Sequence, residues 1–199
     1  IYDASHAFGV NYAEKSVLNY GDASTLSFHA TKVFHTIEGG AVVFREKEVY
    51  DRAKKLINFG LDMDGKPTEV GINAKLNEYQ AAVGLTLLDA IDEILEHRSE
   101  LFELYRQSLD GYVGLPVWSD KSSVNGAYLP IMLEDEAEKK RIKIALEKSG
   151  VPSREYFSPS LNVVFKPEDP CPISESISTR ILCLPLHYYL TRNNVKYIT

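Results

Sequence analysis

The hydrophobic positions in the first part of the chain follow first a strand period and then a helix period. Residues 25–29 alternate polar and apolar side chains, and residues 41–44 form a short, fully apolar strand candidate. Between residues 46 and 59 apolar side chains recur at helical spacing, and Gly60 stands where such a helix would end. A strand followed by a helix predicts an α/β layer here.

The strongest helical pattern runs from residue 77 to residue 109, with no proline and one internal glycine, Gly84. A single helix of that length would extend about 50 Å, so we expect it either to bend or to connect two domains. The glycine-rich residues 60–72 predict a loop in front of it.

The pattern changes after Gly111. A strand is expected at residues 127–133, a helix at residues 134–149 and a second strand at residues 180–184. The proline-rich residues 155–178 predict loop. We therefore expect three parts: residues 1–85 as an α/β unit, residues 86–109 as a connecting helix, and residues 110–199 as a smaller α+β domain.

Charge and composition exclude several classes of function. The 199 residues carry a net charge of -6, which argues against a nucleic-acid surface. Acidic residues flank the longest basic run, residues 139–141, which predicts a solvated helix face. The two cysteines, Cys171 and Cys183, show neither a CxxC motif nor a zinc spacing, so they fit a reducing, cytoplasmic compartment, with a disulfide left open. No signal peptide or apolar run of membrane-spanning length is present, so no membrane partner is expected.

Two residues in the first part of the chain could carry chemistry. Lys32 lies just after a predicted strand among small and apolar residues, where loss of water would favour the neutral, nucleophilic amine. Asp3 follows the apolar start of the chain. A pyridine-containing cofactor acts as an electron sink only while its ring nitrogen is protonated, and a carboxylate is the usual group that holds that proton. The alternatives are a surface lysine and a capping aspartate.

Five blocks of sequence resemble the DegT/DnrJ/EryC1/StrS family of sugar aminotransferases, which depend on pyridoxal phosphate (PLP). The match covers nearly all of residues 1–85 in order, and it continues more loosely beyond residue 110. The five blocks are residues 3–9, 21–22, 27–32, 38–41 and 73–82. The looser matches are residues 150–154 and 156–159.

The resemblance implies an α/β fold. Residues 1–85 would be the C-terminal part of the large domain of a fold-type I PLP transferase, a three-layer α/β/α structure with a mostly parallel sheet, and an α+β domain would follow. The chain opens on Ile1 in strand-like sequence, and the family places a phosphate-binding loop and a ring-stacking aromatic residue in front of that point. We therefore expect an N-terminal part outside this sequence, an exposed sheet edge, and weak PLP binding by this chain alone.

The resemblance also implies roles for five residues. Lys32 would form the Schiff base with PLP and later move a proton, and Asp3 would pair with the pyridine nitrogen. His6 stands where the family has Gln or His near the phenolic oxygen of PLP, and Ser27 where a hydroxyl binds the phosphate. Asn73 matches an Asn that reaches the phosphate of the partner subunit, which implies a homodimer with shared active sites.

The implied activity is amino transfer from glutamate to a nucleotide-linked keto sugar. Residues 34–40 resemble the branch that acts on dTDP-4-keto-6-deoxyhexoses, in the biosynthesis of deoxyamino sugars such as those of lipopolysaccharide. One alternative is a PLP-dependent sugar dehydratase of the same family, but those enzymes replace the lysine with histidine. Another is a non-catalytic regulatory protein on the same fold, against which the set of Asp3, Ser27 and Lys32 argues.

Overall fold

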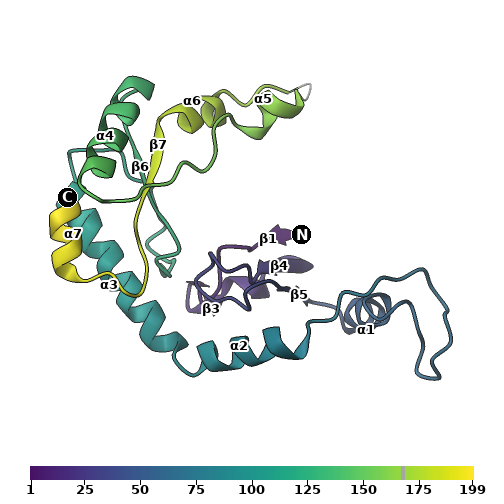
Figure 1. Ribbon diagram of the computed structural model, residues 1–199. Helices are drawn as coiled ribbons and strands as arrows, with labels where there is room; N and C mark the ends of the chain where they lie inside the picture. The colour runs from purple at the N-terminus through teal and green to yellow at the C-terminus, as the bar shows by residue number, and fades with distance from the viewer. Residues whose placement is uncertain (167–168) are drawn as a thin grey trace. The chain divides into compact units, whose positions relative to one another are not determined.

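The computed structural model describes residues 1–166 and 169–199, which divide into two compact units (Figure 1). The first unit comprises residues 1–95 and 120–125, and the second comprises residues 96–119 and 126–199. The division into residues 1–85, 86–109 and 110–199 stays a prediction about the domains of the protein.

A three-stranded sheet forms the centre of the first unit. Its strands, in spatial order, are β1 (Tyr2–Asp3), β4 (Ala23–Ser27) and β5 (Gly40–Phe44). β1 runs parallel to β4, with Asp3 opposite Thr25, and β5 runs antiparallel to β4, with Gly40 opposite Ser27. Of the strand predicted at residues 25–29, residues 25–27 lie in β4, whose Ser24 and Leu26 are buried between half-buried neighbours, whereas Phe28 and His29 lie beyond its end. The sheet has β1 at one edge, where the side chain of Tyr2 is exposed.

A small hairpin precedes β4. It pairs β2 (Asn11–Tyr12) with β3 (Lys15–Ser16), and the single turn of 3-10 helix η1 (Val17–Asn19) follows. Residues 120–125 return from far along the sequence to this hairpin, since Ser123 N–H donates to Asn11 C=O at 2.9 Å. The first unit is therefore built from two separate stretches of chain.

Three helices account for the helical patterns between residues 46 and 109. They are α1 (Lys47–Leu56), α2 (Glu78–Leu88) and α3 (Ile91–Leu109). The long pattern is divided at residues 89–90, where Ala90 N–H donates to Leu87 C=O, three residues back, at 3.1 Å. Such a tightened last turn ends α2 without any proline. Where the pattern predicted one bent helix or a connection between two domains, the structure shows two separate helices, α2 and α3.

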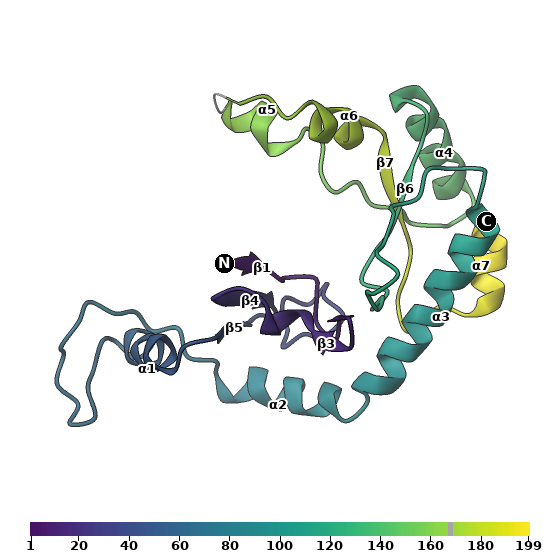
Figure 2. The same cartoon turned by 180° about the vertical axis from the view of Figure 1, so that it is seen from behind.

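The helix α2 is fixed at its start and packed at its middle. The Asn77 side chain accepts a hydrogen bond from Gln80 N–H at 2.9 Å and completes a capping box. Gly84 is buried, and a Cβ atom there would lie 2.9 Å from the methyl group of Thr36. Figures 1 and 2 show α2 running along one side of the strands of the first unit. Only a residue without a side chain allows this approach to the loop after β4.

The second unit combines a two-stranded sheet with helices, as expected for residues beyond 110. Its strands β6 (Leu129–Met132) and β7 (Ile181–Leu184) are antiparallel. The helices other than α3 are α4 (Glu136–Lys148), α5 (Leu161–Phe165), α6 (Pro172–Arg180) and α7 (Arg192–Ile198). Its core contains several fully buried side chains: Leu101, Tyr105, Leu129, Leu182 and Val195.

The expectation of loop throughout residues 155–178 is wrong, because α5 and most of α6 lie in this range. Pro172 occupies the first turn of α6. A proline there lacks only an N–H group that has no helical partner anyway, so it begins a helix rather than breaking it.

One ionic cluster in the second unit is partly buried. Lys139, on α4, is 4% exposed, and its Nζ lies 2.7 Å from Glu155 Oε2. Lys143, one turn further along α4, bonds the other oxygen of Glu155, also at 2.7 Å. The two ammonium groups lower the pKa of Glu155 to about 2 through hydrogen bonds and charge. The cluster ties the segment after α4 back to that helix.

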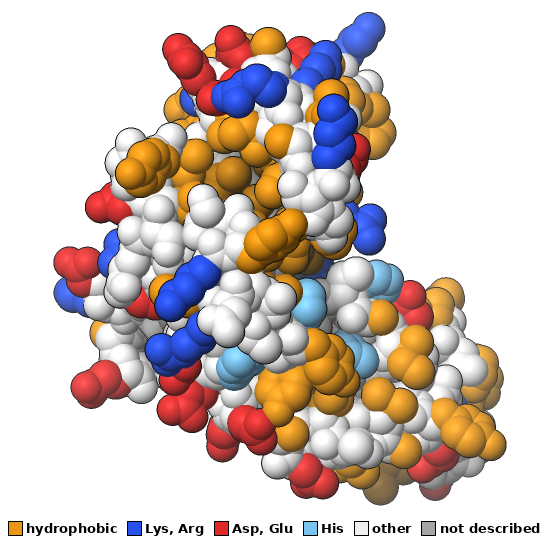
Figure 3. All heavy atoms as spheres, turned by 60° about the vertical axis from the view of Figure 1, so that its left-hand side comes forward, with side chains coloured by type: hydrophobic (Ala, Val, Ile, Leu, Met, Phe, Trp, Pro, Cys, Tyr) orange, Lys and Arg blue, Asp and Glu red, His pale blue; other side chains and the backbone are white. Residues whose placement is uncertain are grey.

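The surface of the molecule includes exposed hydrophobic side chains, several of which are visible in Figure 3. Some of the most exposed lie in the loop between α1 and α2, where Met63, Val70 and Ile72 stand largely in solvent. Within residues 1–166 and 169–199, no helix has the combination of length and apolar character that crossing a bilayer requires.

Candidate functional site

The two strands that precede the candidate residues end at the same edge of the first sheet. β1 ends at Asp3 and β4 ends at Ser27, and the two strands are parallel neighbours. The loop of residues 4–10 leaves this edge after β1, and the loop of residues 28–39 leaves it after β4. The carboxyl ends of parallel strands are where α/β proteins place their ligands.

Asp3 presents an ionised carboxylate at this edge. Ser5 donates to Asp3 Oδ1 from both its hydroxyl and its backbone N–H, and these two bonds lower the pKa of Asp3. The nearby charges of His6 and Lys32 lower that pKa further. Within the described part of the chain, Asp3 Oδ2 accepts no hydrogen bond. One oxygen is thus fixed by Ser5 while the other can receive a ligand.

Lys32 lies in a bend in the loop after β4, and its backbone N–H donates to His29 C=O at 2.9 Å. Its side chain is half-buried, and among the described residues its Nζ makes no hydrogen bond or ion pair. Its charge acts on both Asp3 and His6, so the three groups share one neighbourhood. The structure therefore brings together the amine and the carboxylate that the sequence singled out.

His6 completes this group of charges. Protein atoms displace part of the water around its imidazole, which lowers its pKa, and the positive charge of Lys32 lowers it further. The carboxylate of Asp3 acts in the opposite direction and only partly offsets these two effects. The imidazole is therefore favoured in its neutral form, which can both donate and accept a hydrogen bond.

An aromatic cluster joins the two loops that carry these residues. Phe8, after His6, stacks on Phe34, after Lys32, with ring centroids 4.5 Å apart. Phe28 meets Phe34 edge to face at 4.8 Å. Aromatic pairs contribute about 0.5–1.5 kcal/mol each beyond the area that they bury. This packing holds the loop of His6 and the loop of Lys32 as one layer.

Hydrogen bonds close the loop of Lys32 upon itself. Thr36 N–H donates to Phe28 C=O at 2.9 Å, and the Thr36 hydroxyl donates to Glu38 C=O at 2.7 Å. His29 Nε2 lies 3.6 Å from a carboxylate oxygen of Glu38. Thr36 is 2% exposed, so this closure is anchored in the interior. These hydrogen bonds fix the conformation of the loop that carries Lys32.

The remaining two candidates, Ser27 and Asn73, lie in different parts of the first unit. Ser27 is the last residue of β4, half-buried, and its hydroxyl accepts from His29 N–H at 3.4 Å. Asn73 lies in the segment before α2, where its backbone pairs with Asn58 just beyond α1. Its side chain is exposed, and the described residues offer its amide no hydrogen-bond partner. The structure thus places Ser27 at the edge shared with Asp3, whereas among the described residues no hydrogen bond or ion pair links Asn73 to the other four.

Two features of the site were not predicted from the sequence. One is the aromatic cluster, for which the spacing of Phe28 and Phe34 in one loop is only a weak local signal. The other is Asn125, whose side-chain amide donates to the backbone of the His6 loop from 119 positions away in the sequence. No local pattern could have indicated that contact.

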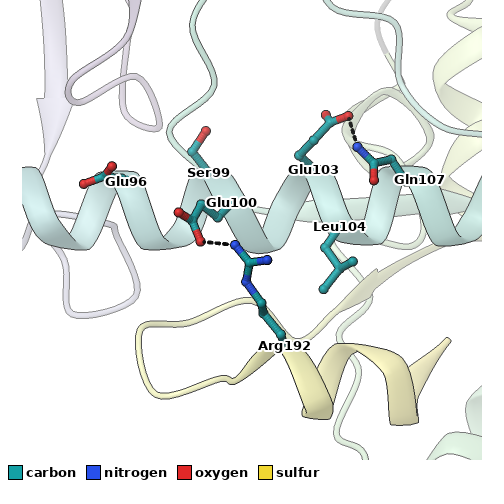
Figure 4. A pocket seen from close by; sticks show the side chains of 7 residues that line it. All are labelled: Glu96, Ser99, Glu100, Glu103, Leu104, Gln107 and Arg192. Carbon is teal, nitrogen blue, oxygen red and sulfur yellow. Dashed lines mark hydrogen bonds and ion pairs between the residues drawn. The ribbon is translucent and has the colours of Figure 1, made fainter.

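A hollow lies along α3, and it does not resemble the candidate site. Figure 4 shows it lined by acidic side chains of α3 together with Arg192. Glu100 pairs with Arg192 at 2.8 Å, and Glu103 accepts from Gln107 at 3.0 Å. Glu100, Glu103 and Arg192 are thus partnered within the protein. The predicted cofactor residues do not line this hollow.

Comparisons with known proteins find similar sugar transaminases. The dTDP-4-amino-4,6-dideoxy-D-glucose transaminase of Shigella dysenteriae is 36% identical over 207 residues, which cover 100% of this chain and 56% of that protein. The transaminase of the same name from Escherichia coli is 32% identical and is covered to 57%. The chain therefore spans somewhat more than half the length of these curated relatives.

Solved structures show the same fold. A DegT DnrJ EryC1 StrS aminotransferase from Brucella abortus has a TM-score of 0.91 and 26% identity, over 98% of this chain and 54% of that one. DesI, solved in the presence of its TDP-sugar product, has a TM-score of 0.87 and 32% identity, over 98% and 52% of the two chains. The model of the DegT/DnrJ/EryC1/StrS aminotransferase family matches residues 1–199. A match over the whole chain, joined to the grouping of Asp3, His6 and Lys32, places this protein in the DegT/DnrJ/EryC1/StrS aminotransferase family.

Proposed function

We propose that the protein to which this chain contributes is a PLP-dependent aminotransferase that acts on a nucleotide-linked keto sugar, with Lys32 as its reactive amine. The observation that carries the proposal is the position of Lys32. Its side chain is half-buried and makes no hydrogen bond among the described residues. Its positive charge is close enough to lower the pKa of both Asp3 and His6. A purely structural lysine would be expected to pair with a carboxylate or extend into solvent.

The residues at the sheet edge fit PLP in three respects. Asp3 is an ionised carboxylate with one free oxygen, as a protonated pyridine nitrogen requires. Lys32 offers an amine from the neighbouring loop, and Ser27 offers a hydroxyl at the end of β4 for a phosphate. When bound, PLP supplies an aldehyde and an electron sink, which the protein's own side chains lack.

Each residue then has a defined task. Asp3 keeps the proton on the pyridine nitrogen, because its lowered pKa leaves the carboxylate ionised. Lys32 would hold the cofactor through its amine and could act as both base and acid. His6, favoured as a neutral imidazole, hydrogen-bonds the phenolic oxygen. Asn73, exposed on its separate segment, serves the phosphate held by the partner subunit of a homodimer.

The names of the relatives support the substrate class. Both curated relatives described above are named for a dTDP-linked 4-amino-4,6-dideoxy sugar, and DesI was solved with a TDP-sugar product. We therefore assign a dTDP-4-keto-6-deoxyhexose as acceptor and glutamate as donor. The amino group passes from glutamate to the keto carbon of the sugar, and 2-oxoglutarate is left. The product would serve deoxyamino sugar biosynthesis in the cytoplasm, including that of lipopolysaccharide.

The proposal is tested in the full-length protein loaded with PLP, with Lys32→Ala and the exposed hairpin substitution Lys15→Ala as its matched control. We expect Lys32→Ala to abolish both the visible absorbance of lysine-linked PLP and the transfer of nitrogen from glutamate to the keto sugar. Lys15→Ala should keep both. An unchanged absorbance band in Lys32→Ala would refute the assignment of the amine. Loss of the sugar hydroxyl without gain of nitrogen, in the wild type, would indicate a dehydratase instead.

A further inference from the structure

The loop that carries His6 needs support from outside itself. It leaves the two-residue strand β1 and turns twice, through Ala7 N–H to Ala4 C=O at 2.9 Å and Val10 N–H to Ala7 C=O at 3.1 Å. Gly9 within it has a φ of +74°. A loop of this kind, tied by two turn bonds, does not by itself fix the direction of an imidazole.

Asn125 supplies that support from a distant part of the sequence. Its side-chain Nδ2 donates to the carbonyl oxygens of both His6 and Phe8, each at 2.9 Å. The side chain is 8% exposed, so water competes little for these bonds. Both amide hydrogens are thus directed at two alternate carbonyls of one loop, and the peptide units 6–7 and 8–9 are held.

The segment that carries Asn125 is itself anchored to the hairpin in front of β4. Lys121 C=O accepts from Ala13 N–H at 2.9 Å, and the Ser123 hydroxyl accepts from Asn11 N–H at 2.8 Å. A donor on a floating segment could follow a moving loop, whereas a donor on an anchored one restrains it. Asn125 therefore restrains the His6 loop from a segment that is itself held in place.

The restraint extends to the loop of Lys32. Asn125 holds the carbonyl of Phe8, and the ring of Phe8 stacks on Phe34 only two residues after Lys32. A shift of the first loop would therefore disturb the second.

We infer that Asn125 is a positioning residue of the candidate site, which sets His6, and through Phe8 and Phe34 also Lys32, in register with the bound cofactor. This inference rests on the proposed function for the roles of His6 and Lys32. The contact itself does not depend on that function. Asn125 touches the loop backbone and acts only through other residues.

The test compares four variants of the full-length protein. Asn125→Leu removes both donors while keeping the size of the side chain, and Asn125→Ser is a smaller second change in case the leucine variant does not fold. Ser123→Ala removes one hydrogen bond that anchors the same segment, while the bonds of Ser123 N–H to Asn11 C=O and of Ala13 N–H to Lys121 C=O remain. Leu101→Ala destabilises the core of the second unit and controls for a general loss of stability.

Two readouts are measured on each variant. Without PLP, hydrogen exchange of the peptide spanning residues 4–10 should become about 10-fold faster or more in both Asn125 variants, since two hydrogen bonds are lost. With PLP, both variants should bind the cofactor about 10-fold more weakly and change the ratio of its visible absorbance bands, because His6 is no longer held. Ser123→Ala and Leu101→Ala should leave the bands unchanged.

The outcomes separate this inference from the proposed function. If the wild type shows no visible PLP band, the proposed function fails, and the exchange of residues 4–10 alone still tests the contact. If the wild type binds PLP but the folded Asn125 variants match Ser123→Ala in both exchange and absorbance, the positioning role is wrong. A change of absorbance shared by Leu101→Ala would likewise overturn it, because the effect would then follow stability and not position.

Discussion

Replacing Glu155 with Gln should destabilise the second unit strongly. The substitution leaves the Lys139 ammonium, 4% exposed, without an anion beside it. Removing one partner of a buried ion pair typically costs about 3–5 kcal/mol. The lowering of the pKa of Glu155 from 4.5 to about 2 corresponds to about 3 kcal/mol as an upper value. Because the carboxylate is 30% exposed, screening reduces this figure, and we expect a loss of about 2–3 kcal/mol at pH 7.

The effect has a defined pH dependence. A carboxylate whose pKa is lowered by folding contributes its full stabilisation above the unfolded value, here 4.5, and loses it as the pH falls toward the folded value of about 2. The free energy of unfolding of the wild type should therefore decrease between pH 5 and pH 2 more steeply than that of Glu155→Gln. The difference between the two proteins should shrink toward the acid end of this range.

Urea unfolding at several pH values measures both effects. Trp118, the single tryptophan of the sequence, packs edge-on against Phe102 in the same unit at 4.8 Å and reports on it by fluorescence. Circular dichroism recorded in parallel checks that one transition is observed. The control is Glu147→Gln, an exposed carboxylate of α4 without an ion pair among the described residues. Equal stability and parallel pH curves for Glu155→Gln and Glu147→Gln would refute the reasoning.

Two smaller effects follow from the same structure. Asn77→Ala removes the cap and capping box of α2 and should lower the free energy of unfolding by about 1 kcal/mol. Thermal unfolding measures this loss. An equal loss in Thr86→Ala, on the exposed surface of the same helix, would contradict the prediction. Iodoacetamide at pH 8 should modify exposed Cys171 well before Cys183, whose burial raises the pKa of its thiol to about 11. Mass spectrometry of the alkylated peptides decides this, and equal rates for the two thiols would speak against the burial of Cys183.

Much of the fold could be predicted because it follows local periodicity. The strand at residues 41–44 and the helix between residues 46 and 59 appear as β5 (Gly40–Phe44) and α1 (Lys47–Leu56). The end of α2 at Leu88 could not be placed, since its tightened last turn depends on packing and has no proline or glycine to mark it. α6 does not follow from the sequence pattern, because prolines usually end helices, although Pro172 begins this one.

The candidate site was predictable only in its outline. Asp3 ends β1 and Lys32 follows β4, and the parallel pairing of these two strands brings both residues to one edge. The contact from Asn125 depends on a return of the chain over more than a hundred residues, which no local pattern encodes. The cofactor roles of Ser27 and Asn73 came from the family resemblance, and they stay predictions that binding experiments must decide.

The return of residues 120–125 to the first unit limits how this protein can be recombined. A chimaera joined at a single crossover after residue 95 would inherit the hairpin of the first unit from one parent and the strand-like segment that pairs with it from another. Such a hybrid would mismatch the Asn11–Ser123 and His6–Asn125 contacts whenever the parents differ there. Exchange of the first unit between relatives should therefore transfer two stretches of gene together, and library designs with one junction should yield few functional proteins.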